Sequence, residues 1–124
     1  MYKTLICANV HARTRRKFQE AKMLEKELEK KFKYQIEKRG AMVLKFVSPG
    51  KAGVPDRLVL LPYGRAVFVE FKAPGEKPRS LQVHVMKELE GKKFDCWVID
   101  NPGLIRLFEQ CYFGFEGHAN GTVK

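Results

Sequence analysis

The sequence lacks the cysteine pattern of a disulfide-stabilised or zinc-binding protein. Its 124 residues include three cysteines, which are odd in number, far apart and without C-x-x-C spacing. This usage excludes a disulfide framework and a cysteine-based zinc site, and it is typical of a reducing compartment. The three are Cys7, Cys96 and Cys111; Cys96 lies in an apolar run, where we expect a small core residue.

Long apolar runs are also missing. No segment approaches the length that a membrane-spanning helix needs. The mildly apolar residues 1–10 are followed by the basic cluster 13–17, whereas a signal peptide carries its positive charge before the apolar stretch. We therefore expect no export, no membrane partner and a cytoplasmic location.

Acidic residues are few relative to basic ones. Lys and Arg number 24 and Asp and Glu number 14, which gives a formal net charge of +10 and a sequence pI of about 9.7. A domain this basic is a candidate for binding nucleic acid, although a basic solvated surface would give the same net charge and pI. No repeat or low-complexity segment accompanies the charge.

What is present is the periodicity of a mixed α/β domain. Apolar residues recur every four positions at Leu24, Leu28, Phe32 and Ile36, which predicts one helix stripe, and Gly40 is suited to end that helix. The predicted elements are a helix over 23–39, strands over 41–47, 57–61 and 66–72, a helix over 81–90, a strand over 94–99 and a helix over 104–111. Helices packed against a central mixed sheet are the expected architecture.

The two ends of the chain look different from the predicted domain, residues 23–112. Residues 1–22 lack steady periodicity and are interpreted as a poorly ordered tail or as an upstream extension if the natural start is Met23; a basic arm that touches phosphates is the alternative. Residues 113–124 are predicted to be a frayed tail. The apolar segments 104–108 and 112–113 either form a dimer surface or close the core.

The strand predicted over 66–72 carries the most informative side chains. Because alternate side chains point to opposite faces, Glu70 and Lys72 share one face, although their neighbours are apolar. Charges in such a setting are costly unless they are paired or bound to a metal. A hairpin through residues 62–65 would bring Asp56, at the start of the preceding strand, beside Glu70 and Lys72.

Two carboxylates and a lysine at one sheet edge suit phosphodiester hydrolysis. Mg²⁺ is commonly held by one or two carboxylates together with phosphate oxygens and water, and it neutralises developing charge. A lysine can position the attacking water or stabilise an oxyanion. The structural alternative is an Asp56 turn cap with a Glu70–Lys72 ion pair; the apolar setting and the basic charge favour catalysis.

A third carboxylate could come from the first predicted helix. At 100° per residue, Glu25 lies within the apolar stripe and Glu29 lies at its edge, while Glu27 and Glu37 point elsewhere. Glu25 is therefore the favoured candidate, and Glu29 remains the alternative.

At these residues the chain resembles the VRR-NUC domain, a branch of the PD-(D/E)XK nucleases found in phages and in DNA-repair and recombination proteins. The likeness covers about residues 24–99. It is carried by Gly53-Val54-Pro55-Asp56, Val69-Glu70-Phe71-Lys72-Ala73-Pro74-Gly75, Lys77-Pro78 and Leu81-Gln82, with Glu25 set ahead of Gly40. Residues 1–22 match no part of the family pattern.

The resemblance implies a restriction-endonuclease-like core and a Mg²⁺- or Mn²⁺-dependent endonuclease without a nucleotide cofactor. It implies that Asp56, Glu70 and the helix glutamate hold the metal with the Phe71 backbone carbonyl, that Lys72 activates or positions water, and that Gln82 braces Lys72 or contacts substrate. Similar stand-alone viral domains resemble Holliday-junction resolvases, so branched DNA and a homodimer are expected. A non-catalytic DNA-binding module, or a nuclease subunit that needs partners, is the alternative.

Several basic residues near the proposed site are candidate phosphate contacts, although each could be an ordinary solvated charge. They are Lys51, Lys77 and Arg79, ranked first for their loop positions, followed by Arg57 and Lys45. Phosphate contacts position DNA without reading its sequence, and no base-reading motif is present, so selectivity for structure is expected. The histidines, which do not cluster, are interpreted as non-ligands, and Phe94 and Trp97 as core.

Overall fold

The computed structural model describes residues 2–114, with side chains from Thr14 onward. The elements in chain order are α1 (Tyr2–Glu37), β1 (Met42–Lys45), β2 (Arg57–Leu60), β3 (Ala66–Phe71), α2 (Ser80–Gly91), β4 (Asp95–Ile99) and α3 (Pro102–Phe113). This is the predicted order of elements, and the predicted mixed α/β architecture is confirmed. Among residues 2–114, no helix is both long and apolar enough to cross a membrane.

The four strands form one sheet in the order β1-β2-β3-β4. The first three are antiparallel neighbours, and β4 joins β3 in parallel through the α2 crossover. The predicted hairpin between β2 and β3 is confirmed: the Leu61 N–H donates to the Arg65 carbonyl at 2.8 Å, and Gly64 supplies the positive φ of 80° in the turn.

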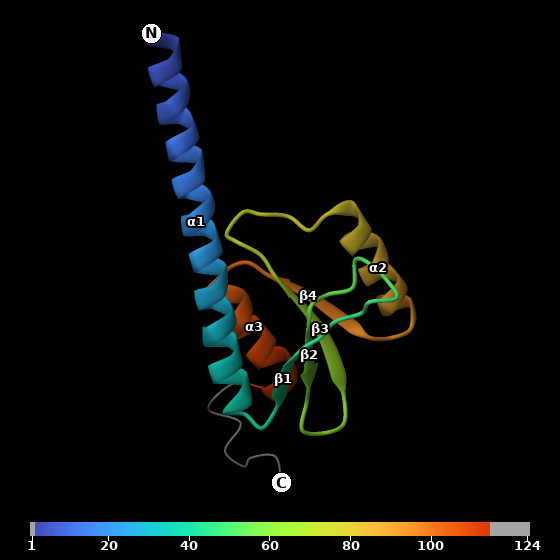
Figure 1. Ribbon diagram of the computed structural model, residues 1–124. Helices are drawn as coiled ribbons and strands as arrows, with labels where there is room; N and C mark the ends of the chain where they lie inside the picture. Colours follow the sequence, from blue (N-terminus) through green and yellow to red (C-terminus); the bar gives the residue numbers. More distant parts are fainter. Residues whose placement is uncertain (1, 115–124) are drawn as a thin grey trace.

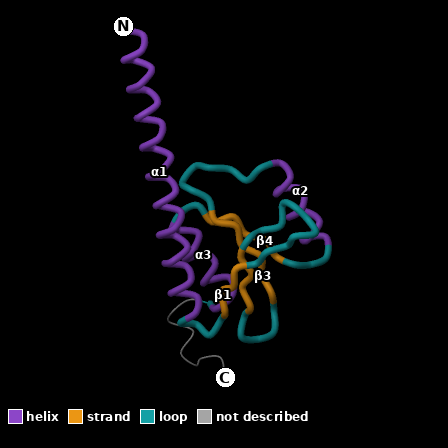
Figure 2. The backbone as a smooth tube through the Cα atoms, viewed as in Figure 1, coloured by secondary structure: helices purple, strands orange, loops and turns teal. Residues whose placement is uncertain are grey.

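The helices cover the sheet from both sides. Helices α1 and α3 lie against one face, and α2 lies on the other, next to β4 (Figure 1; Figure 2). The core sits between the sheet and the α1–α3 pair. Its fully buried side chains are Phe32, Ile36, Val59, Val67, Val69, Ile99, Ile105 and Phe108. Burial of Ile105 and Phe108 shows that the apolar segment 104–108 closes the core.

The first helix is longer than predicted. It begins at Tyr2 instead of near Met23, so residues 2–22, expected to lack regular structure, are helical. Its N-terminal half extends past the sheet (Figure 1), and Leu24, predicted as part of the apolar stripe, is 49 % exposed. The helix gives way to a turn after Glu37, and Gly40 adopts the left-handed conformation, with φ 94°.

Two apolar side chains, Leu81 and Phe94, are exposed, and Phe94 was predicted to lie in the core. In α2 the buried residues are Gln82, Val85 and Met86, whereas Leu81 is 50 % exposed. The buried face of this helix therefore includes the polar Gln82 and leaves out Leu81. Phe94 precedes β4 and is exposed, because it lies outside the face that α1 and α3 cover. The side chains of Cys7 and His11, and residues 115–124 with His118, lie outside what the structure describes.

Candidate active site

The β2–β3 hairpin brings Asp56 and Glu70 together. Arg57 pairs with Val69 in the antiparallel register, so the next positions outward are Asp56 and Glu70. The Asp56 backbone N–H donates to Glu70 Oε1 at 3.2 Å. The predicted proximity of the two carboxylates is thus present at the end of the sheet where β3 finishes.

The loop before Asp56 is held close to α2. Gly53 has a positive φ of 85°, and a Cβ at this position would lie 2.8 Å from Leu81 Cγ and 3.1 Å from the Leu81 carbonyl oxygen. Only glycine fits such a close approach without strain. Contact between this loop and the start of α2 sets where Asp56 lies.

Glu70 is a buried carboxylate with several polar neighbours. Its side chain lies on the face of β3 opposite Val69 and Phe71, and the residue is 7 % exposed. Gln82 Nε2 donates to Glu70 Oε2 at 3.1 Å, and Lys72 Nζ lies 3.6 Å from the same oxygen. Burial, followed by the nearby Asp56 charge, raises the pKa of Glu70.

Gln82 connects this carboxylate to the start of α2. Its Oε1 accepts from the Arg79 backbone N–H at 2.9 Å, while its amide nitrogen donates to Glu70. In this structure Gln82 therefore braces Glu70; the resemblance implied that it braces Lys72 or contacts substrate, and that role stays a prediction. Both polar ends of the buried amide have partners, so the side chain is held in one orientation.

Asp56 presents an unpaired oxygen. Oδ1 is buried and has no hydrogen-bond partner among the described residues, and Oδ2 lies 3.4 Å from Arg57 Nη1. A buried unpaired carboxylate oxygen is costly, and an ion or water would relieve that cost. Together with Glu70 it offers the hard oxygen donors that Mg²⁺ and Mn²⁺ prefer, so these residues fit a divalent cation.

The two candidate helix glutamates differ in their surroundings. Glu29 Oε2 accepts from Arg57 Nη2 at 2.7 Å, so its charge is paired. Glu25 has no such ion pair in the described part of the chain; burial raises its pKa, the Glu76 and Glu29 charges raise it further, and Lys72 acts against them. Glu25 therefore lies within electrostatic reach of Lys72. Residues 14–114 contain no group of three or more His, Cys, Asp or Glu side chains arranged to hold a metal.

Lys72 is largely buried between two acidic side chains. Its side chain is 12 % exposed, and Nζ lies 3.6 Å from Glu70 and 3.9 Å from Glu76. The sequence reasoning did not include Glu76, although its position four residues after Lys72 was visible. The arrangement holds the ammonium group next to the proposed metal-binding carboxylates.

The candidate phosphate contacts differ in whether their charges are already paired with a carboxylate. Arg57 is engaged by Glu29 and Asp56, and Lys51 Nζ lies 3.3 Å from Glu88. Lys45, Lys77 and Arg79 are exposed. His84 is exposed and lies 3.7 Å from Glu88, away from the carboxylate pair.

The chain is similar to a phage protein and to a solved domain structure. A protein named "Putative nuclease p44", from Acyrthosiphon pisum secondary endosymbiont phage 1, is 45 % identical over 80 residues, which are 64 % of this chain and 86 % of that protein. A solved structure described as a VRR_NUC domain superposes with a TM-score of 0.69 at 27 % identity, covering 73 % of this chain and 98 % of the other. No family model matches the sequence.

The chain belongs to the VRR-NUC nuclease family. The fold class predicted from the sequence, a restriction-endonuclease-like core, is confirmed by the same comparison. Within this VRR-NUC domain, Asp56, Glu70 and Lys72 lie together at one end of the sheet, as strand alternation and the hairpin predicted, and Gln82, named by the resemblance, contacts Glu70 there. Their individual roles stay predictions.

Proposed function

We propose that this protein is a Mg²⁺- or Mn²⁺-dependent endonuclease that hydrolyses phosphodiester bonds in DNA. The observation that supports this most directly is the buried, unpaired Oδ1 of Asp56 beside the buried carboxylate of Glu70. Leaving that oxygen unpaired costs about 1–3 kcal/mol, which a bound cation would offset. Membership of a nuclease family supports the same reaction.

In this proposal Asp56 and Glu70 would hold the cation together with the Phe71 backbone carbonyl. Glu25 would be a third carboxylate, although residues 14–114 hold no preformed group of three. A bound cation would supply charge stabilisation at the scissile phosphate. Lys72 directs its ammonium group at the attacking water and remains held between Glu70 and Glu76. Gln82 keeps Glu70 in position by donating to Oε2. Glu29 acts through Arg57, which lies beside Asp56.

We further propose that the substrate is branched DNA, such as a Holliday junction or a flap, cut by a homodimer. The basic charge supports DNA as the partner, and residues 2–114 contain no element that resembles a base-reading module. Apolar side chains remain exposed on β1 and β2, on the sheet face that carries α2 but away from that helix, and support a contact between two copies: Met42, Leu44 and Leu60. Light scattering after gel filtration measures the oligomeric state; a monomer at all concentrations contradicts the homodimer.

The deciding experiment is a cleavage assay on a four-way junction, a flap and plain duplex, with Mg²⁺ or with chelator. We expect wild type to cut branched DNA with Mg²⁺, and Lys72→Ala to bind DNA but not cut it. Wild type that binds DNA without cutting any substrate would favour a non-catalytic binding module. Cleavage that needs a cellular extract would favour a subunit of a larger assembly.

A further inference from the structure

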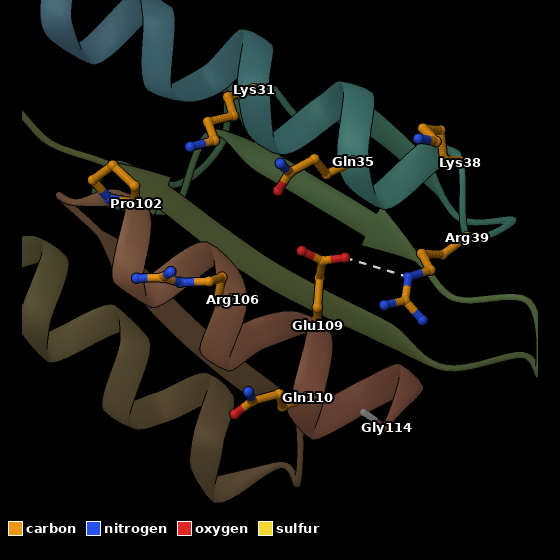
Figure 3. Close-up of a pocket in the computed structure, with 9 residues that line it drawn as sticks. All are labelled: Lys31, Gln35, Lys38, Arg39, Pro102, Arg106, Glu109, Gln110 and Gly114. Carbon is orange, nitrogen blue, oxygen red and sulfur yellow. Dashed lines mark hydrogen bonds and ion pairs between the residues drawn. The ribbon is translucent and has the colours of Figure 1, made fainter. Parts of the chain in front are cut away.

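A basic groove lies between α1 and α3, outside the candidate active site. Its volume is about 540 Å³. Figure 3 shows side chains from both helices around it, with Lys31 and Gln35 on α1 directed toward the space that Arg106 borders from α3.

The charge of this groove is predominantly positive. It is lined by four cationic side chains and one carboxylate: Lys31, Lys38, Arg39, Arg106 and Glu109. Glu109 is paired with Arg39 at 3.3 Å, so it does not offset the other three. Within residues 14–114, Lys31 and Arg106 form no ion pair with a carboxylate.

One end of the groove, lined by Lys31 and Pro102, lies toward the end of the sheet where the active site lies. Lys31 is two residues beyond Glu29, whose carboxylate holds Arg57 beside Asp56. Pro102, at the other side of the groove, begins α3 shortly after β4 ends at Ile99, the residue paired with Phe71. From Lys31 to Lys38 the helix rises about 10 Å, which is comparable to about three nucleotide steps along one DNA strand.

We propose that this groove binds the sugar–phosphate backbone of the DNA segment that continues beyond the cleavage site. This inference rests on the proposed function, because it takes the substrate to be DNA. Lys31 contributes a point charge, and the Arg106 guanidinium can donate two hydrogen bonds to one phosphate. The Gln35 amide can donate a further N–H. Such contacts hold DNA without reading bases and fix the direction in which the substrate leaves the site.

The test compares two pairs of charge reversals. The groove pair is Lys31→Glu with Arg106→Glu; the control pair is Lys33→Glu with Lys87→Glu, which are exposed positions outside the groove and change the net charge equally. Binding of fluorescein-labelled duplex and four-way junction is measured by anisotropy with chelator present, over a sodium chloride series. Thermal melting and circular dichroism confirm that each variant is folded.

The groove pair is expected to lose about tenfold or more in affinity. Its slope of log affinity against log salt should fall by about two, because two phosphates are no longer neutralised. The control pair should lose less affinity and less slope. A milder pair, Lys31→Gln with Arg106→Gln, should show the same order of effects if charge reversal prevents folding. If wild type binds and cuts DNA but the groove and control pairs are indistinguishable, the groove inference is overturned. If wild type binds no DNA, the proposed function fails as well.

Discussion

The Asp56 backbone N–H donates to Glu70 Oε1 at 3.2 Å across the β2–β3 hairpin. This hydrogen bond holds two carboxylates next to each other although 14 positions separate them in sequence. It favours the charged form of Glu70, but burial and the Asp56 charge outweigh it, so the pKa of Glu70 is raised. Burial and the neighbouring Asp56 charge thus disfavour the ionised form of Glu70, a cost that a bound divalent cation would offset.

The first prediction concerns Asp56→Asn. A carboxyl whose folded-state pKa is raised contributes stability that is fully present below its unfolded pKa and is lost as pH rises through the folded pKa. Removing the Asp56 charge lowers the folded-state pKa of Glu70. Between mildly acidic and neutral pH, the melting temperature of the variant should therefore fall less than that of wild type. Thermal melts in chelator measure this, and an unchanged pH dependence would contradict the proposed coupling.

The same variant tests metal binding without an activity assay. Mg²⁺ or Mn²⁺ should raise the melting temperature of wild type, because a ligand that binds only the folded state stabilises it. Asp56→Asn should lose most of that rise. Equal rises in both proteins would mean that Asp56 does not hold the cation.

How far the sequence predicts the site depends on how many positions separate the interacting residues in the chain. Strand alternation and a short hairpin are local, so they were sufficient to place Glu70, Lys72 and Asp56 together. The exposure of Leu24 was not predictable in this way, because the periodicity of a helix does not say where the sheet beneath it ends. The Glu29–Arg57 pair likewise joins a helix and a strand 28 positions apart.

The second prediction separates Glu25 from Glu29. Glu25→Gln should abolish most cleavage and weaken Mg²⁺ dependence, because the proposal makes Glu25 a metal-holding carboxylate within electrostatic reach of Lys72. Glu29→Gln should keep cleavage at reduced rate and lower stability by about 1 kcal/mol through its weakened interaction with Arg57. Cleavage rates over a Mg²⁺ series and denaturant melts give both quantities. An active Glu25→Gln with an inactive Glu29→Gln would reverse the assignment.

The third prediction concerns the loop that carries Asp56. Gly53→Ala introduces a Cβ into a left-handed position within 2.8 Å of Leu81 Cγ, so it should destabilise the fold by about 1–2 kcal/mol and lower the cleavage rate by displacing Asp56. Gly50→Ala is the matched control in the same loop, since its Cβ would meet no atom within 4 Å. The two variants should differ both in urea midpoint and in activity; equal behaviour would show that the close approach to α2 is unimportant.

The fourth prediction concerns a polar network at the opposite end of the sheet. Trp97 Nε1 donates to the Tyr112 hydroxyl at 2.8 Å, and that hydroxyl donates to Asp95, which also accepts from Arg65. Burial, followed by the hydrogen bond to Asp95, raises the pKa of Tyr112.

Asp95 pairs with Val67 at the start of β3, whereas Glu70 lies near the end of that strand, so the network should serve folding and not cleavage. Tyr112→Phe keeps the ring packed on Trp97 and Phe108 but removes the acceptor of the Trp97 N–H and one of the donors to Asp95. We expect a loss of about 1–3 kcal/mol in unfolding free energy, measured by urea titration, with an unchanged cleavage rate below the transition. A fall in the cleavage rate of fully folded Tyr112→Phe would show instead that the two ends of the sheet are coupled.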